Sequence, residues 1–169
     1  MRTAGLVTIA LLAAALVYGE STAAELLTAD VDGWHTWRTD EPGTVTGMCC
    51  FTRDPGAQSQ TGCNLDGSRV SYGNGGNCSA EPGHAQIYAL MKNGNLTRIR
   101  VLSSECPVST ETQLTDHGVI SSDKNIEWFS SVIENEQISQ DIREEALFGL
   151  VQSESDAAFE YIDRLLSRR

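Results

Sequence analysis

Two adjacent cysteines, Cys49 and Cys50, are the residues of this chain whose types most directly suggest chemistry. Such a pair could bind a metal ion, exchange thiols, or send its two sulfurs into separate structural disulfides. Adjacent side chains in a strand point to opposite faces of the sheet. We therefore expect the two cysteines to reach different partners rather than each other.

The chain has 5 cysteines, and their spacing favours disulfide bonds. No Cys-x-x-Cys motif occurs, and the intervals match none of the common zinc patterns. Because the number is odd, at least one thiol must stay free or pair between two chains. Our preferred pairing joins Cys49 or Cys50 to Cys63, and Cys78 to Cys106. Spacing alone does not establish this pairing, so all five cysteines are disulfide candidates.

The other reactive residue types form no catalytic pattern. The three histidines are scattered, and neither Gly-x-Ser-x-Gly nor His-Glu-x-x-His is present. We predict no catalytic residue, no metal site and no cofactor, and hence a protein that is not an enzyme. The alternative hypothesis is a thiol-redox or metal-binding protein centred on Cys49, Cys50 and His84.

The start of the chain and its charge indicate where the protein acts. Arg2, an apolar stretch and small residues up to Ala24 are typical of a secretory signal peptide over residues 1–24. No later stretch is long enough to cross a membrane, so we expect a secreted or periplasmic protein with no span in the mature chain. The net charge of −11 argues against nucleic acid and anionic lipid as partners.

Residues 25–118 have the composition of a small β-rich domain, with short apolar runs between turn residues. The clearest element is a hairpin about Asn93-Gly94, because both central residues of a type I′ turn need positive φ. Alternation in its strands predicts an antiparallel sheet with one buried and one partly wet face. Further strands are expected near 45–51, 69–72 and 33–38.

Residues 119–169 change to helical spacing, with apolar residues three and four apart. We predict three short amphipathic helices over about 125–134, 140–152 and 156–166, with Ser139 capping the second. The expected fold class is therefore α+β, a small antiparallel sheet domain with disulfides followed by a two- to three-helix segment.

The last of these segments resembles a single HEAT repeat over about residues 139–166. The resemblance rests on four features: a β-branched residue between Asp and Arg, Ala and Leu at helical spacing, a polar turn, and an Asp-Ala start to the second helix. The matching residues are Asp141, Ile142, Arg143, Ala146, Leu147, Leu150, Asp156, Ala157, Ile162, Leu165 and Leu166. The resemblance implies a helical pair that serves protein interaction rather than catalysis. A lone unit cannot form the long concave surface of a solenoid, and the alternative is that the helices simply pack on the β domain.

Aromatic residues supply the expected interaction surface. A patch near the mature N-terminus and the helix faces would offer Trp34, Trp37, Trp128, Phe148 and Tyr161 to a partner. The alternative for the first two is that they belong to the core. The sequence thus predicts a non-catalytic protein-interaction or envelope-associated binding module with a protein partner, and it leaves open a homodimer through the helices or the odd cysteine.

Overall fold

A computed structural model describes residues 31–42, 49–52, 60–61, 63–67, 71–73, 83–152 and 155–167 of the chain. The predicted signal peptide, residues 1–24, lies outside the described residues, and so does Cys78. Within the described residues no helix is both long and apolar enough to cross a membrane.

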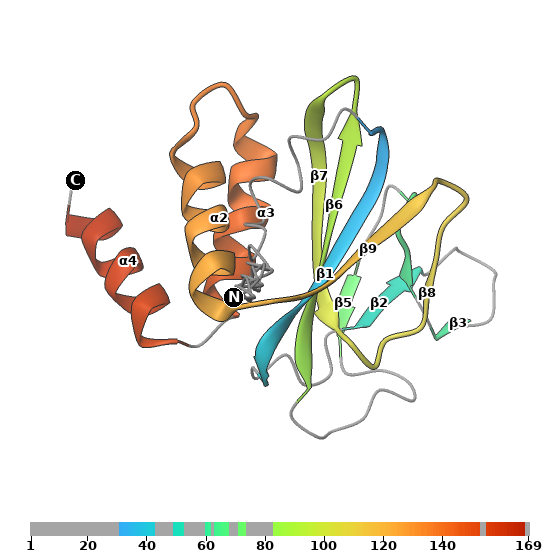
Figure 1. The fold of residues 1–169 in the computed structure, drawn as a ribbon, viewed down its shortest axis with the longest axis horizontal. Helices are drawn as coiled ribbons and strands as arrows, with labels where there is room; N and C mark the ends of the chain where they lie inside the picture. The colour runs from blue at the N-terminus through green and yellow to red at the C-terminus, as the bar shows by residue number, and fades with distance from the viewer. Residues whose placement is uncertain are drawn as a thin grey trace, which may run out of the picture.

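A four-stranded sheet forms the centre of the molecule, in the order β7-β6-β1-β9 (Figure 1). Its strands are β1 (Gly33–Pro42), β6 (His84–Lys92), β7 (Asn95–Ser103) and β9 (Leu114–Ile120). β6 pairs antiparallel with both β1 and β7, whereas β1 and β9 run parallel. The sheet is therefore mixed, not antiparallel as the sequence predicted, because the connection after β7 returns the chain to run alongside β1.

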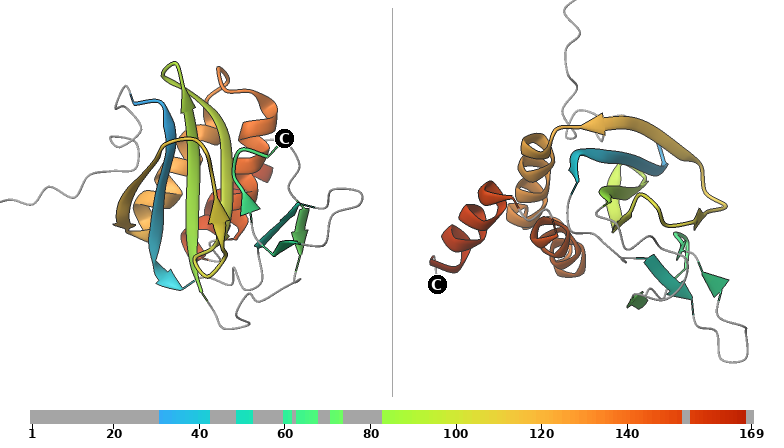
Figure 2. Two further views of the ribbon diagram at one scale, coloured as in Figure 1. Left: turned by 90° about the vertical axis from the view of Figure 1, so that its right-hand side faces the viewer. Right: turned by 90° about the horizontal axis from the view of Figure 1, so that it is seen from below.

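Shorter strands lie on one side of this sheet and the helices on the other (Figure 2). β2 (Cys49–Thr52) pairs with β3 (Gln60–Thr61) and with β5 (Ser71–Gly73), and β4 (Cys63–Asn64) pairs in parallel with β8 (Val108–Ser109). The strands expected near 45–51 and 69–72 overlap β2 and β5.

The hairpin of β6 and β7 is confirmed. Asn93 has φ of 51° and Gly94 has φ of 71°, as a type I′ turn requires. The turn sends β7 back along β6, with Ile87 opposite Val101 and Ala89 opposite Ile99.

The prediction of one wet face was wrong, because β6 is buried on both. Ile87 and Ala89 belong to the core beneath the helices, while Tyr88 and Leu90 belong to a second cluster on the opposite face. The segment 63–67 and the connection through β8 cover that second face, which the alternation of one strand cannot reveal.

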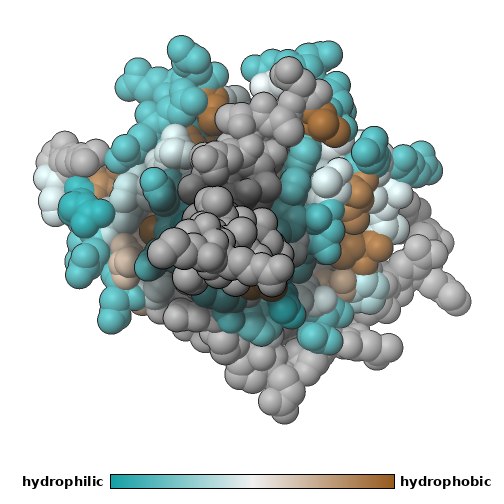
Figure 3. Space-filling model, in the orientation of Figure 1, coloured by the Kyte–Doolittle hydropathy of each residue, from teal (hydrophilic) through white to brown (hydrophobic). Residues whose placement is uncertain are grey.

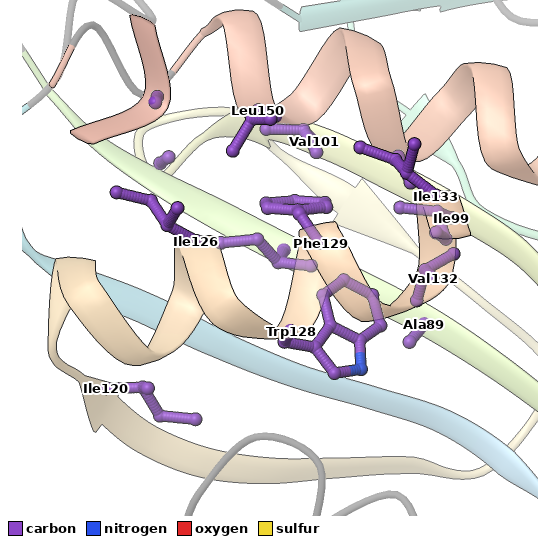
Figure 4. Packing of buried hydrophobic residues seen from close by; sticks show 14 of the residues in the cluster. Ala89, Ile99, Val101, Ile120, Ile126, Trp128, Phe129, Val132, Ile133 and Leu150 are labelled. Atoms are coloured by element: carbon purple, nitrogen blue, oxygen red, sulfur yellow. The ribbon is translucent and has the colours of Figure 1, made fainter. Parts of the chain in front are cut away.

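Three helices follow the sheet, as predicted: α2 (Ser122–Glu134), α3 (Gln140–Val151) and α4 (Asp156–Ser167). Ser139 stands at the N-cap of α3, but its side chain makes no capping hydrogen bond. Figure 4 shows Phe129 of α2 pointing toward Leu150 of α3 and Val101 of β7. The helices and the described strands of the four-stranded sheet thus contribute to one hydrophobic core.

Candidate binding groove

A groove of about 550 Å³ opens between the tip of the β6–β7 hairpin and the connection from α2 to α3. The Asn93-Gly94 turn forms one wall, and the Asn95 side-chain amide donates to the Asn93 carbonyl at 2.8 Å. This contact ties the start of β7 to the turn. The turn geometry and this hydrogen bond thus shape the wall locally.

The second wall is the connection 135–139, which is also held by its own hydrogen bonds. The Asn135 side-chain oxygen accepts the Gln137 backbone N–H at 3.0 Å, and the Asn135 carbonyl accepts the Ile138 N–H at 3.1 Å. Short polar side chains commonly stabilise turns in this way. Ile138 is thereby placed at the groove, where it also packs on the main core.

Among the described residues, none that lines the groove is ionisable, although 21% of the residues in the chain are charged. The lining combines apolar side chains with neutral hydrogen-bonding groups from Met91, Gly94, Asn95, Leu96, Thr97, Trp128, Ser131, Val132, Asn135, Gln137, Ile138, Ser139 and Ile142. A charged ligand would lose its hydration in this groove without gaining an opposite charge, which costs free energy. The groove therefore suits an uncharged ligand with apolar groups.

A second hollow, of about 370 Å³, contrasts with the groove in its charges. It is lined by Arg38, Gln86, Ser104, Glu105, Asp116, Gly118 and Val119. Three of these side chains are charged and exposed, so water solvates them. This hollow therefore lacks the neutral lining of the groove.

The tryptophans predicted as a recognition patch are core residues. Trp34 and Trp37 have no exposed surface, so they cannot contact a partner. Trp37 meets Trp128 edge to face, with ring centroids 4.8 Å apart, and donates from Nε1 to the Asn125 side-chain oxygen at 3.0 Å. The expectation of a surface patch failed because the two strand faces that carry these rings are both covered.

The helix residues of the predicted surface divide in the same way. Tyr161 is buried, with its hydroxyl 3.3 Å from a Glu134 carboxylate oxygen, and Trp128 is 4% exposed. Trp128 nevertheless reaches the lining of the groove. Phe148 is 38% exposed and is the one member of the predicted surface that faces solvent to this extent.

The cysteines are described in part. Cys63 and Cys106 are both buried and both disulfide-bonded, and neither is a free thiol. No disulfide joins these two described cysteines to each other. The side chains of Cys49, Cys50 and Cys78 lie outside the described residues, so the predicted pairing stays a prediction.

His35 and His117 form a contact that sequence reasoning missed. Parallel pairing of β1 and β9 brings His35 Nδ1 within 2.9 Å of His117 Nε2, with the ring planes 4° apart. His35 Nε2 lies 2.9 Å from the Val31 carbonyl, which can only accept, so this nitrogen carries a proton. In the neutral pair His117 therefore donates to His35, and the two rings link the strands.

The surroundings of this pair disfavour the charged form of His117. His35 is 1% exposed, and burial lowers the pKa of His117, with His35 adding to the effect and Asp116 opposing it. On the other face of the sheet, burial and the charge of Asp116 raise the pKa of Tyr88 to about 12. A hydrogen bond with Thr36 lowers this pKa and so partly offsets the rise. The described residues contain no group of three or more His, Cys, Asp or Glu side chains placed to hold a metal ion.

The sequence held only weak signals for this groove. The Asn-Gly turn predicted one wall, but nothing in the segment 135–139 indicated that it would lie against a hairpin more than 40 residues earlier. The chain was also compared with known proteins. It matches no family model, no curated protein and no solved structure.

Proposed function

We propose that this protein is an exported, non-catalytic binding module whose groove takes an uncharged, apolar segment of a partner protein. The observation that carries the proposal is the electroneutral lining of the groove in a chain of net charge −11. Its volume falls within the roughly 300 to 1,000 Å³ of typical ligand sites.

A peptide segment fits the chemistry of the lining. Apolar side chains of the segment would contact Leu96, Ile138 and Ile142, which are partly buried and pack on the core. Its backbone amides would meet the neutral amide and hydroxyl groups at the rim, such as Asn95 and Gln137.

The rest of the visible surface supports a localised contact rather than a broad one. Among the coloured residues of Figure 3, hydrophobic residues form small separate patches on a largely hydrophilic face. Large contiguous apolar patches usually mark extended protein interfaces. A groove with anchoring pockets is the more suitable site on such a surface.

The test measures binding of short peptides with blocked ends to the mature protein by fluorescence polarisation. We expect neutral peptides with two or three apolar residues to bind, and versions with Lys or Asp at those positions to bind at least about tenfold more weakly. In the protein, Leu96→Lys and Ile138→Asp should each cause a loss of that size.

The matched control is Leu114→Lys, which places the same charge at an exposed apolar position on β9 outside the groove. It should bind the neutral peptides as the unmodified protein does. Equal binding of charged and neutral peptides, or unchanged affinity in both groove variants, would contradict the proposal. Export is tested separately, by finding a mature N-terminus just after Ala23 or Ala24.

A further inference from the structure

Two side chains cover the outer edge of β7 at one residue, Ile99. β7 is an edge strand of the four-stranded sheet, and α3 packs against it. Edge strands present unpaired N–H and C=O groups to which another chain can add. In an antiparallel strand the N–H and C=O of one residue point to the same side, so the partners of each residue show which groups face outward.

Ile99 is a residue of β7 whose two backbone groups face outward. Its N–H donates to Glu145 Oε2 of α3 at 2.8 Å, and its carbonyl accepts from Arg100 Nη1 at 2.8 Å. Arg100 and Glu145 are also joined directly as an ion pair. Together they supply one acceptor and one donor, as the peptide group of a neighbouring strand would.

Stability alone does not explain an ion pair at this place. The Arg100 side chain is 7% exposed, and its Nε has no hydrogen-bond partner. Buried ion pairs are often no more stabilising than apolar residues of similar size. The arrangement is specific, however, for the backbone of Ile99.

Irregularities also occur near the tip of β7 and on the opposite edge of the sheet. A register shift between Leu90 and Met91 disturbs β7 near the hairpin tip. On the opposite edge, the pairing of β1 with β9 is shifted, and Asp116 Oδ1 accepts the Gly118 backbone N–H at 2.9 Å. Bulges and covered backbone groups are the means by which natural sheets avoid edge-to-edge association.

We propose that the Arg100–Glu145 ion pair takes the place of a neighbouring strand at Ile99 and thereby prevents a second copy of this chain from pairing along β7. The proposal is independent of the groove. It assigns the pair an interaction-blocking role that a merely stabilising contact would not have.

The test is the self-association of a variant that removes both charges, Arg100→Met with Glu145→Leu, measured by sedimentation of the full mature protein. We expect its dissociation constant for self-association to be at least tenfold lower than that of the unmodified protein. Glu144→Leu, which adds the same apolar side chain at the exposed neighbouring position of α3, should leave that constant unchanged.

A folded double variant that associates no more than the unmodified protein would overturn the proposal. If that variant does not fold, Glu145→Leu alone decides, because it leaves the Ile99 N–H without its acceptor. Its dissociation constant for self-association should be at least tenfold lower than that of the unmodified protein. An unchanged constant would show that the ion pair does not block this edge and would overturn the proposal.

Discussion

Asp66 joins three parts of the chain that are distant in sequence. Its carboxylate accepts hydrogen bonds from Trp34 Nε1 at 2.9 Å, Thr110 Oγ1 at 2.8 Å and the Glu111 N–H at 2.7 Å. Thr112 donates to the same carboxylate from its hydroxyl at 2.9 Å. Burial by itself would raise the pKa of Asp66, but these hydrogen bonds outweigh it and hold the pKa well below its usual range.

We expect Asp66→Asn to lower the free energy of unfolding by about 1 to 3 kcal/mol. The amide NH₂ group of asparagine would replace one carboxylate oxygen and would face N–H and O–H donors, so those hydrogen bonds would be lost. The side chain is only partly buried, which limits the loss of free energy. Urea denaturation at pH 7 measures the effect. Asp32→Asn, at an exposed position, is the control, and an equal effect of both variants would contradict this role.

The lowered pKa of His117 predicts that the stability of the protein depends on pH. Because its pKa is lowered in the folded state, the unfolded chain binds its proton more readily. The stability that the neutral His117 contributes is therefore complete above about pH 6.5 and is lost as the pH falls through the lowered pKa of the folded state. We expect the urea concentration at the midpoint of unfolding to decrease when the pH is lowered from 7 to 5.

His117→Gln should remove much of this dependence, because its amide can still donate to His35 Nδ1 but does not titrate. His84→Asn is the control, since that histidine contacts the Thr39 carbonyl away from the pair. Identical pH profiles for His117→Gln and the unmodified protein would show that the pair does not titrate as argued.

At the scale of elements, the close approach of α3 to α2 and β7 depends on Gly149. A Cβ atom at this position would lie 2.6 Å from Phe129 Cζ and 2.8 Å from Val101 Cγ2. Phe129 is fully buried, and Figure 4 shows its ring between the helices and the sheet. Displacing this buried ring would disturb the packing of the core.

We expect Gly149→Ala to destabilise the protein by about 1 to 2 kcal/mol, because overpacking outweighs the better helix propensity of alanine. Thermal or urea unfolding measures the change. In the background of Phe129→Leu the same substitution should cost less, since the two residues compete for one space. A stabilising Gly149→Ala, or strictly additive effects, would contradict the proposed contact.

For the whole molecule, the shared core predicts one cooperative transition. Trp37 from the sheet and Trp128 from α2 lie in the same cluster, whereas Trp34 lies in the cluster on the other face. Unfolding followed by helix content and by tryptophan fluorescence should therefore coincide. Transitions separated along the urea axis would mean that sheet and helices unfold independently.

Much of the local structure could be predicted from the sequence because local physics determines it. The Asn-Gly turn needs positive φ at both residues, and the apolar spacing of 125–166 indicates three helices without showing what they pack against. The α+β class follows from these two patterns. The resemblance of 139–166 to a HEAT unit remains a prediction.

The tertiary structure alone decided what those elements face. β9 carries polar residues and a glycine, and it became a strand because pairing with β1 outweighed its weak propensity. The burial of Trp34 and Trp37, the contact of His35 with His117 and the neutral groove all join residues that are far apart in sequence. Periodicity reports which face of an element is apolar, but it carries no information about which distant segment will cover that face.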